Sequence, residues 1–276
     1  MLSHIRKIIP KKFRKFLRGN YSSYIEPHLE KIKFFNCELK NSEIYINSIF
    51  KKKGIEIGGP SFFFRNFLKV YKNIESLDNV NFKSKTLWQD NKNLNGFLWS
   101  KSKNKIGKEF ICCSTNMSII PDESYDFILS CHQIEHVANP LKAIKEFRRI
   151  LKKSGYLILI LPNSKFNFDH NRKVITFSHL LDDFNFNVSE NDLTHLNESL
   201  ELTDFSKNFI EFNRFKELAE DNFNNRILHH HIFNYKLIQD VCKFTDFTLL
   251  QFDEIKTKFP SLDFICKKNL QTGVKK

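Results

Sequence analysis

The chain has 276 residues, of which 41 % are hydrophobic, so it is long enough for one large α/β domain with an insertion and too apolar for a disordered chain. Lys and Arg exceed Asp and Glu by 44 to 31, and this net charge of +13 leaves RNA or an anionic surface open as partners. Six cysteines without a C-x-x-C pair do not imply a disulfide framework in a chain of this length, and reduced thiols predict a cytoplasmic protein. No uncharged apolar run of about 18 residues is present, so no membrane span is expected.

Residues 1–50 predict a basic helical lead-in without a chemical motif. Within it, residues 1–20 carry Lys and Arg but no acid, interleaved with Ile, Phe and Leu. Such an arm fits a solvated helix packed on the domain, and it also fits peripheral contact with an anionic membrane or with RNA.

Residues 51–163 predict the core of the fold. Short apolar runs alternate here with helical stretches, which is typical of βαβ units in a doubly wound, Rossmann-like parallel sheet. The expected strands are 54–57, 74–78, 110–113 and 125–130.

A well-marked helix follows, with Asn139 as its N-cap and Pro140 in its first turn. Gly155 is expected at its left-handed exit. The apolar run 156–161 then predicts a strand that is covered on both faces and stopped by Pro162.

Residues 164–231 interrupt the alternation and predict a mostly helical insertion after the fifth strand. Residues 232–276 return to the core, with a helix over 235–244 and two closing strands at 247–252 and 262–266.

Two features point to a ligand at the carboxyl edge of the sheet. The turn that begins at Gly58 and Gly59 lets a ligand approach the backbone closely, although the full G-x-G-x-x-G and the phosphate-binding G-x-x-x-x-G-K-[ST] are missing. Asp78 ends the second expected strand and could accept hydrogen bonds from ribose hydroxyls, or simply form a turn with Asn79.

The run 121–140, continued by the L-K-x-x-G type exit at 151–155, resembles the class I S-adenosylmethionine (SAM)-dependent methyltransferases, and the resemblance covers 52–163 well and 228–267 loosely. It implies SAM as the cofactor. By this resemblance, Glu56, Gly58 and Gly59 would contact the methionine end of SAM, and Asp78 would contact its ribose. Thr115 and Asn116 would contact the adenine, and the sulfonium would be bordered by Ser130, Cys131 and His132. This chain departs from the family at Pro60-Ser61, which shorten the glycine motif. Glu135 and His136 are interpreted as either structural or part of the pocket.

The insertion is similar to that of a bacterial branch linked to envelope polysaccharide biosynthesis, which carries a D-H-x-R stretch and a His-rich entry to the last helix. The resemblance implies that these residues line the acceptor pocket. His170 is the first choice for a general base, with His231 or else His229 as the second. Further residues expected to bind the substrate are Arg172, His179, Asp183 and His229. No metal is expected, because the His and Asp spacing matches no standard site; the alternative is that these are ordinary surface and core histidines.

The leading hypothesis is therefore a SAM-dependent O-methyltransferase whose acceptor is a small molecule such as a sugar or nucleotide-sugar. The alternatives are an RNA methyltransferase, favoured by the charge of +13 but by no RNA-binding module, and a non-catalytic Rossmann-like binding protein. An NAD-linked dehydrogenase fits less well. The sequence leaves the oligomeric state open.

Overall fold

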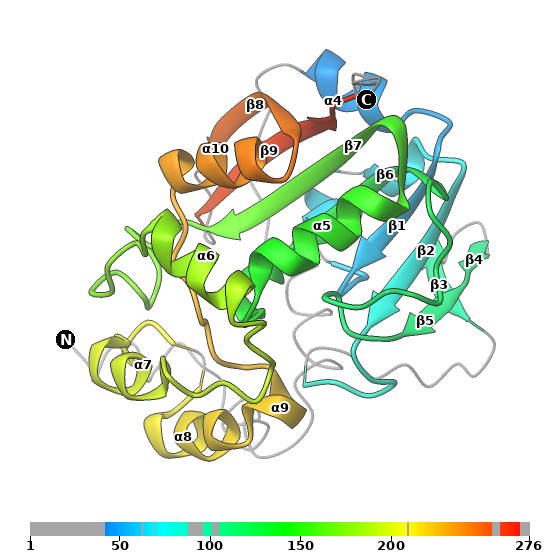
Figure 1. The fold of residues 1–276 in the computed structure, drawn as a ribbon. Helices are drawn as coiled ribbons and strands as arrows, with labels where there is room; N and C mark the ends of the chain where they lie inside the picture. Colours follow the sequence, from blue (N-terminus) through cyan, green and yellow to red (C-terminus); the bar gives the residue numbers. More distant parts are fainter. Residues whose placement is uncertain are drawn as a thin grey trace.

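The computed structural model in Figure 1 describes residues 42–61, 63–68, 70–87, 96–100, 105–208, 210–255 and 260–270. The basic arm at 1–20 and most of the expected lead-in lie outside these ranges, and only α4 (Ser42–Ile49) of the lead-in is described. No helix in the described ranges is long and apolar enough to cross a membrane.

A seven-stranded mixed sheet forms the centre of the fold, in the order β5-β2-β1-β6-β7-β9-β8. Strands β5, β2, β1, β6 and β7 are parallel, whereas β9 runs antiparallel to both of its neighbours. The strands are β1 (Lys53–Ile57), β2 (Ser76–Asn81), β5 (Glu109–Ile111), β6 (Tyr125–Cys131), β7 (Leu151–Pro162), β8 (Phe247–Ile255) and β9 (Ser261–Lys268). The expected doubly wound α/β class is confirmed. A separate hairpin of β3 (Phe97–Ser100) and β4 (Lys105–Gly107) was not expected.

Both faces of the sheet are covered by apolar side chains. On one face, α5 (Pro140–Ile150) and α10 (Tyr235–Phe244) pack on the strands, as Figure 1 shows. On the other face lie α4, the single π-helical turn η1 (Phe63–Phe67) and the 3₁₀ turn η2 (Val70–Lys72). Because β7 is buried on both faces, its central residues are continuously apolar.

Two expected boundaries are wrong. The second strand does not end at Asp78 but continues to Asn81, since the amides of Asn79 and Asn81 find partners inside the fold and the strand tolerates them. The chain also leaves α5 at Ile150 and enters β7 directly.

The second wrong boundary includes the expected left-handed exit at Gly155. The residue with positive φ is Ser154 (58°), in a bulge between the pairs Tyr125–Leu151 and Phe127–Tyr156. Gly155 serves close packing instead, because a Cβ there would lie 2.9 Å from the Lys152 carbonyl oxygen.

The segment after β7 is the mostly helical insertion that the sequence predicts. It holds α6 (Phe177–Asn185), α7 (Leu196–Leu202), α8 (Phe212–Glu220) and α9 (Asn222–Asn225). Figure 1 places it beyond the carboxyl end of β7, with α7, α8 and α9 gathered together. A small core of its own, which includes Phe215, Leu218 and Leu228, joins α7, α8 and the segment that follows α9, separate from the two main clusters.

Candidate functional site

The glycine turn after β1 is fastened to β2. Gly58 has a φ of +77°, and a Cβ there would lie 3.2 Å from the side chain of Gln133. The N–H of Gly59 donates to the side-chain oxygen of Asn79 (3.0 Å), and its carbonyl accepts from the same amide (3.0 Å). This reciprocal pair fixes the turn where the sheet opens towards a ligand.

Glu56 supports the turn from inside the protein. Its buried carboxyl group accepts hydrogen bonds from the Ser61 N–H (2.9 Å) and from the Tyr71 hydroxyl. Burial raises its pKa above the ordinary value, and the two bonds oppose that rise. A Cβ on Gly59 would lie 2.4 Å from the Glu56 carboxyl carbon, so glycine is required there.

A chain of neutral hydrogen-bonding groups connects the carboxyl ends of β5 and β6. The Ser130 hydroxyl donates to Gln133 (3.3 Å), whose amide donates to the Ser114 hydroxyl (3.2 Å). The predicted residues Thr115 and Asn116 follow Ser114 directly. The sequence analysis missed Gln133, because the resemblance assigns a role to the neighbouring His132 instead.

Cys131 and His132 follow Ser130 at the end of β6. Burial and the nearby Glu56 carboxyl raise the pKa of the Cys131 thiol, which makes it a poor nucleophile. His132 has a positive φ (48°), and its Nε2 lies 3.0 Å from the Ser261 hydroxyl of β9.

Asp78 does not lie at the carboxyl edge of the sheet. Its carboxylate accepts hydrogen bonds from the Lys108 N–H (2.7 Å) and from the hydroxyl of Tyr125, which begins β6 (2.7 Å). The residue at the carboxyl end of β2 is Asn81, which donates to the Gly59 carbonyl (3.3 Å) and to Glu109 (3.1 Å). The position expected for the ribose-binding acid thus holds an amide.

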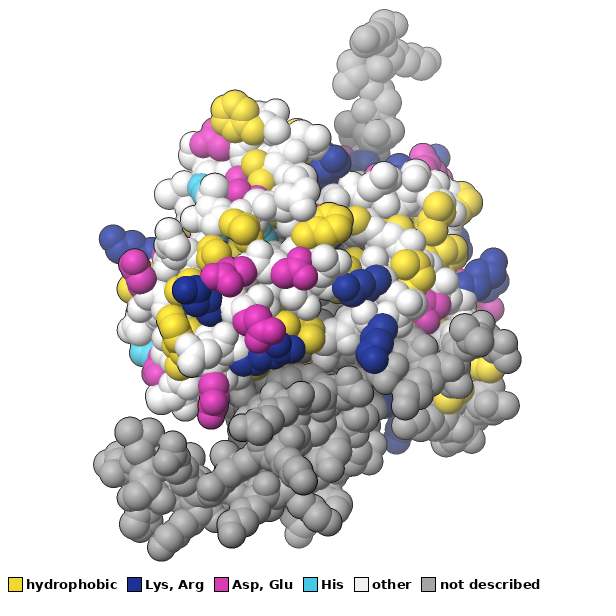
Figure 2. Space-filling view, turned by 90° about the horizontal axis from the view of Figure 1, so that it is seen from below, with side chains coloured by type: hydrophobic (Ala, Val, Ile, Leu, Met, Phe, Trp, Pro, Cys, Tyr) yellow, Lys and Arg dark blue, Asp and Glu magenta, His cyan; other side chains and the backbone are white. Residues whose placement is uncertain are grey.

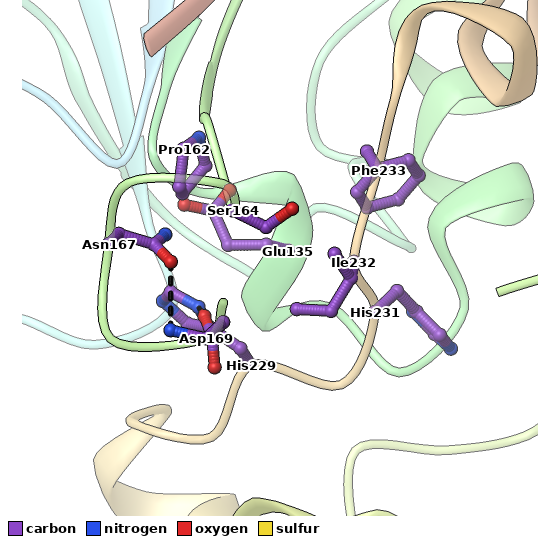
Figure 3. A pocket seen from close by; sticks show the side chains of 9 residues that line it. All are labelled: Glu135, Pro162, Ser164, Asn167, Asp169, His229, His231, Ile232 and Phe233. Atoms are coloured by element: carbon purple, nitrogen blue, oxygen red, sulfur yellow. Dashed lines mark hydrogen bonds and ion pairs between the residues drawn. The ribbon is translucent and has the colours of Figure 1, made fainter. Parts of the chain in front are cut away.

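A pocket lies where β7, the turn after β6 and the insertion meet (Figure 3). Its cavity volume is about 10 Å³, room for about one water molecule. The lining residues are Glu135, Pro162, Ser164, Asn167, Asp169, His229, His231, Ile232 and Phe233.

Glu135, in the turn η4 (Ile134–His136), is the unusual residue of this pocket. Its side chain is 1 % exposed, and neither carboxyl oxygen has a hydrogen-bond partner among the described residues. Burial raises its pKa to about 7. The sequence motif placed this residue beside His136 but could not show whether its carboxyl group was free.

Asp169 and His229 form a buried pair in the same pocket. The His229 Nδ1 lies 2.5 Å from the Asp169 carboxylate. Figure 3 shows the two side chains together among the residues that line the pocket. Burial alone would lower the pKa of His229, but the carboxylates of Asp169 and Glu135 outweigh it and raise that pKa. The pair therefore favours an imidazolium beside a carboxylate.

Two expected acceptor residues lie elsewhere. His170 is exposed, and its ring contacts the Asn167 carbonyl (3.0 Å) and the Lys207 ammonium (3.2 Å), because the tight turn directs Asp169 inward and its neighbour outward. Arg172 is buried, and its guanidinium donates to the carbonyls of His229 (2.8 Å) and His230 (3.4 Å). His170 is therefore no base for this pocket, and Arg172 fastens the insertion rather than offering its charge to an acceptor.

The other expected acceptor residues gather beside the pocket. The His231 Nε2 lies 3.0 Å from the Asp183 carboxylate, which is also 3.4 Å from His179. His179 in turn meets His195, with 3.0 Å between their Nε2 atoms. Burial lowers the pKa of His231 to about 4, so this imidazole is neutral at pH 7.

The sheet order identifies the fold class. Five parallel strands extended by an antiparallel closing pair, with the glycine turn after the central β1, are the α/β methyltransferase fold of class I. Residues 67–159 match the family model described as "Methyltransferase domain". The match spans less than half of the chain, and residues 67–159 are the part that is similar to a methyltransferase domain.

Other similar proteins are distant. An uncharacterised protein of Methanocaldococcus jannaschii is 39 % identical over 59 residues, which is 21 % of this chain and 26 % of that protein, so the chain matches about a quarter of its length. A SAM-dependent methyltransferase from Methanosarcina mazei is 16 % identical, with 83 % of this chain and 98 % of that chain covered and a TM-score of 0.47. One from Aquifex aeolicus is 10 % identical, with 81 % and 86 % covered and a TM-score of 0.47.

Proposed function

We propose that the protein transfers a methyl group from SAM to a hydroxyl of a small molecule such as a sugar or nucleotide-sugar. The observation that carries the proposal is the buried, partnerless carboxyl group of Glu135 in a pocket next to the carboxyl ends of β6 and β7. A carboxyl group kept dry and without hydrogen bonds is costly unless it serves a ligand.

The residues at the sheet edge fit the cofactor. Gly58 leaves room beside Gln133, and the hydroxyl and amide groups of Ser114, Gln133 and Ser130 can bond to a ribose and an amino-acid end. Asn81 takes the place of the usual acid at the end of β2. When bound, SAM supplies an electrophilic methyl group on its sulfonium. Of the expected cofactor contacts, Glu56 and Gly59 act by shaping the turn.

Glu135 is the proposed general base. Its pKa of about 7 leaves a substantial carboxylate fraction at neutral pH, while its basicity stays high. Glu135 would accept the proton of the acceptor hydroxyl as that oxygen takes up the methyl group, whose bond to sulfur would break and leave S-adenosylhomocysteine. The pocket has room for about one water molecule, so its lining side chains would have to move apart to admit the acceptor hydroxyl, and the rest of the acceptor would remain outside.

The Asp169–His229 pair positions that acceptor. Asp169 fixes the His229 ring through Nδ1, so the rest of the ring keeps one orientation in the pocket. A positively charged His229 beside Glu135 also holds the carboxylate in place until the hydroxyl arrives. We therefore assign the role of general base to Glu135 instead of His170, which was the first choice of the sequence analysis.

An RNA acceptor is less well supported. The lining residues include Glu135 and Asp169 but neither Lys nor Arg, whereas RNA binding relies on basic groups along the phosphate backbone. The face in Figure 2 shows acidic and basic side chains intermixed over its described part, with no basic stripe there.

The test joins binding and turnover. The full chain is titrated calorimetrically with S-adenosylhomocysteine, and release of that product is then followed with SAM and a panel of nucleotide-sugars. We expect Glu135→Gln to lower kcat by roughly 10²–10⁴-fold, the usual contribution of a general base, with product affinity unchanged.

His170→Ala is the matched control and should keep wild-type kcat, because its ring lies outside the pocket. A folded protein that binds neither SAM nor its product at millimolar concentration would overturn the proposal. Full activity in Glu135→Gln would remove the base assignment alone.

A further inference from the structure

Three histidines and an aspartate of the insertion converge on one point outside the proposed acceptor pocket. Ligand atoms of His179, His195 and His231 all lie within 4.8 Å of one another. Asp183, one helical turn after His179 on α6, adds a carboxylate oxygen to the same place. Four donors thus come from three separate segments of the chain.

Three distances within the cluster are close to the edge length of a metal tetrahedron. For a zinc ion with bonds of about 2.0–2.1 Å, tetrahedral geometry places neighbouring ligand atoms about 3.3 Å apart. The edges in this cluster measure 3.0 Å from His179 to His195, 3.4 Å from His179 to Asp183 and 3.0 Å from His231 to Asp183.

A hydrogen-bond network explains this cluster less well than an ion does. Two imidazole Nε2 atoms at 3.0 Å can share only one proton, and the same Asp183 oxygen faces both His179 and His231. A divalent cation would satisfy all the converging lone pairs at once.

We propose that His179, Asp183, His195 and His231 bind a divalent transition-metal ion of the zinc class. Imidazole and carboxylate ligands suit such an ion, and four protein ligands make a closed, structural site. The inference goes beyond the proposed methyl transfer and does not depend on it.

The surroundings of the cluster support a metal. The Nδ1 of His195 lies 3.5 Å from the Glu198 carboxylate, the kind of outer partner that orients a metal-bound histidine. The His179 side chain is 37 % exposed while that of His231 is 1 % exposed, so an ion can enter from the α6 side and reach a dry interior.

The ion would connect three parts of the fold. It joins α6, the start of α7 and the strand-like segment before α10. Because His231 also lines the acceptor pocket, the metal would hold one wall of that pocket in place.

The experiment uses the full chain, freed of metal with a chelator, dialysed, and titrated with Zn²⁺ or Co²⁺ alone. We expect one tightly bound ion per chain by elemental analysis, the intense visible absorption of four-coordinate Co²⁺, and a higher Tm with Zn²⁺. His179→Ala should lose the ion and the absorption yet keep its circular dichroism, because this side chain is partly exposed.

His170→Ala is the control and should bind metal as the wild type does, since it removes a histidine that lies outside the cluster. Glu198→Gln should weaken binding by roughly 10–100-fold, as the loss of an outer partner does. A folded wild-type protein that binds no more metal than His179→Ala would overturn the proposal, and so would six-coordinate Co²⁺ spectra.

Discussion

Asp263 shows how a single buried carboxyl group makes stability depend on pH. It lies in β9 between β7 and β8, is 1 % exposed, and neither oxygen has a hydrogen-bond partner among the described residues. Burial and the neighbouring Asp253 raise its pKa well above the ordinary value, so the folded state keeps the proton at pH values where the unfolded chain has lost it.

We expect Asp263→Asn to be more stable than the wild type at neutral pH. Between about pH 4, the ordinary aspartate range, and the raised pKa, the unfolded state binds fewer protons, so wild-type stability falls as pH rises, by up to about 1.4 kcal/mol per unit. The variant lacks this loss. Urea unfolding of both proteins from pH 4 to 8 measures the difference, and a difference that stayed constant over this range would contradict the expectation.

At the residue scale, the sequence predicts which stretch of chain contributes to the site better than it predicts which side chains point into it. It directed attention to the stretch from Asp169 to Arg172, of which Asp169 lines the pocket, but it chose His170 over Asp169. In a tight turn, a shift of one position along the chain changes which side chain faces inward, and the local sequence pattern does not predict that orientation. Asp78 was misplaced because the length of a strand depends on partners such as Gly59, which lies 20 residues away from Asn79.

Helix α5 depends on an N-cap that also joins another element. The Asn139 side-chain oxygen accepts from the Lys142 N–H (3.1 Å), while its amide donates to the Asp183 carbonyl of α6 (2.8 Å). In α10, Asn234 caps through the Leu237 N–H alone (2.8 Å). The two caps therefore form a natural comparison.

We expect Asn139→Ala to lower the free energy of unfolding by about 2 kcal/mol and Asn234→Ala by about 1 kcal/mol, because only the first loses an extra hydrogen bond along with the cap. Asn139→Asp should fall between the wild type and Asn139→Ala, since it keeps the capping oxygen and loses the donor. Chemical denaturation with equal m-values measures all three. Equal losses at the two asparagines would show that the bond to α6 contributes nothing.

Elements with strong periodicity were predictable. The helix expected over 235–244 is α10 with the same bounds. Asn139 is the N-cap of α5 and Pro140 lies in its first turn, as predicted. These features depend on residues that are close together in the sequence, so the sequence could predict them. The bulge at Ser154 was not, since it is set by the pairing of β7 with β6 rather than by the glycine beside it.

The whole molecule consists of a rigid sheet and a smaller helical insertion with its own core. Arg172 connects the start of the insertion to its end, with hydrogen bonds to His229 and His230 and an ion pair to Glu198 (3.2 Å). Since the insertion buries fewer apolar groups than the sheet, it should open at a lower free energy.

We expect Arg172→Lys to raise amide hydrogen exchange in α7 and α8 while exchange in β6 and β7 stays unchanged. Lysine cannot reproduce the planar, multiple hydrogen bonds of the guanidinium. Exchange followed by mass spectrometry measures both regions at once. A uniform rise across the sheet would mean that the two parts unfold as one unit.

At this scale, sequence reasoning predicted the layers and could not predict the sites. The pocket joins Glu135, Asp169 and His229, and the His cluster joins α6, α7 and the segment before α10. Such groupings arise from how distant segments pack, which no local pattern encodes.

The hydrogen bonds of Arg172 to the end of the insertion have a consequence for protein engineering. Because the Arg172 guanidinium donates hydrogen bonds to the carbonyls of His229 and His230, the segment between these residues starts and ends at nearly the same place in space. A segment of this kind behaves as an exchangeable cassette. Swapping it between relatives at these two points would replace α6 to α9 as one block and leave the sheet, its glycine turn and most of the pocket lining untouched.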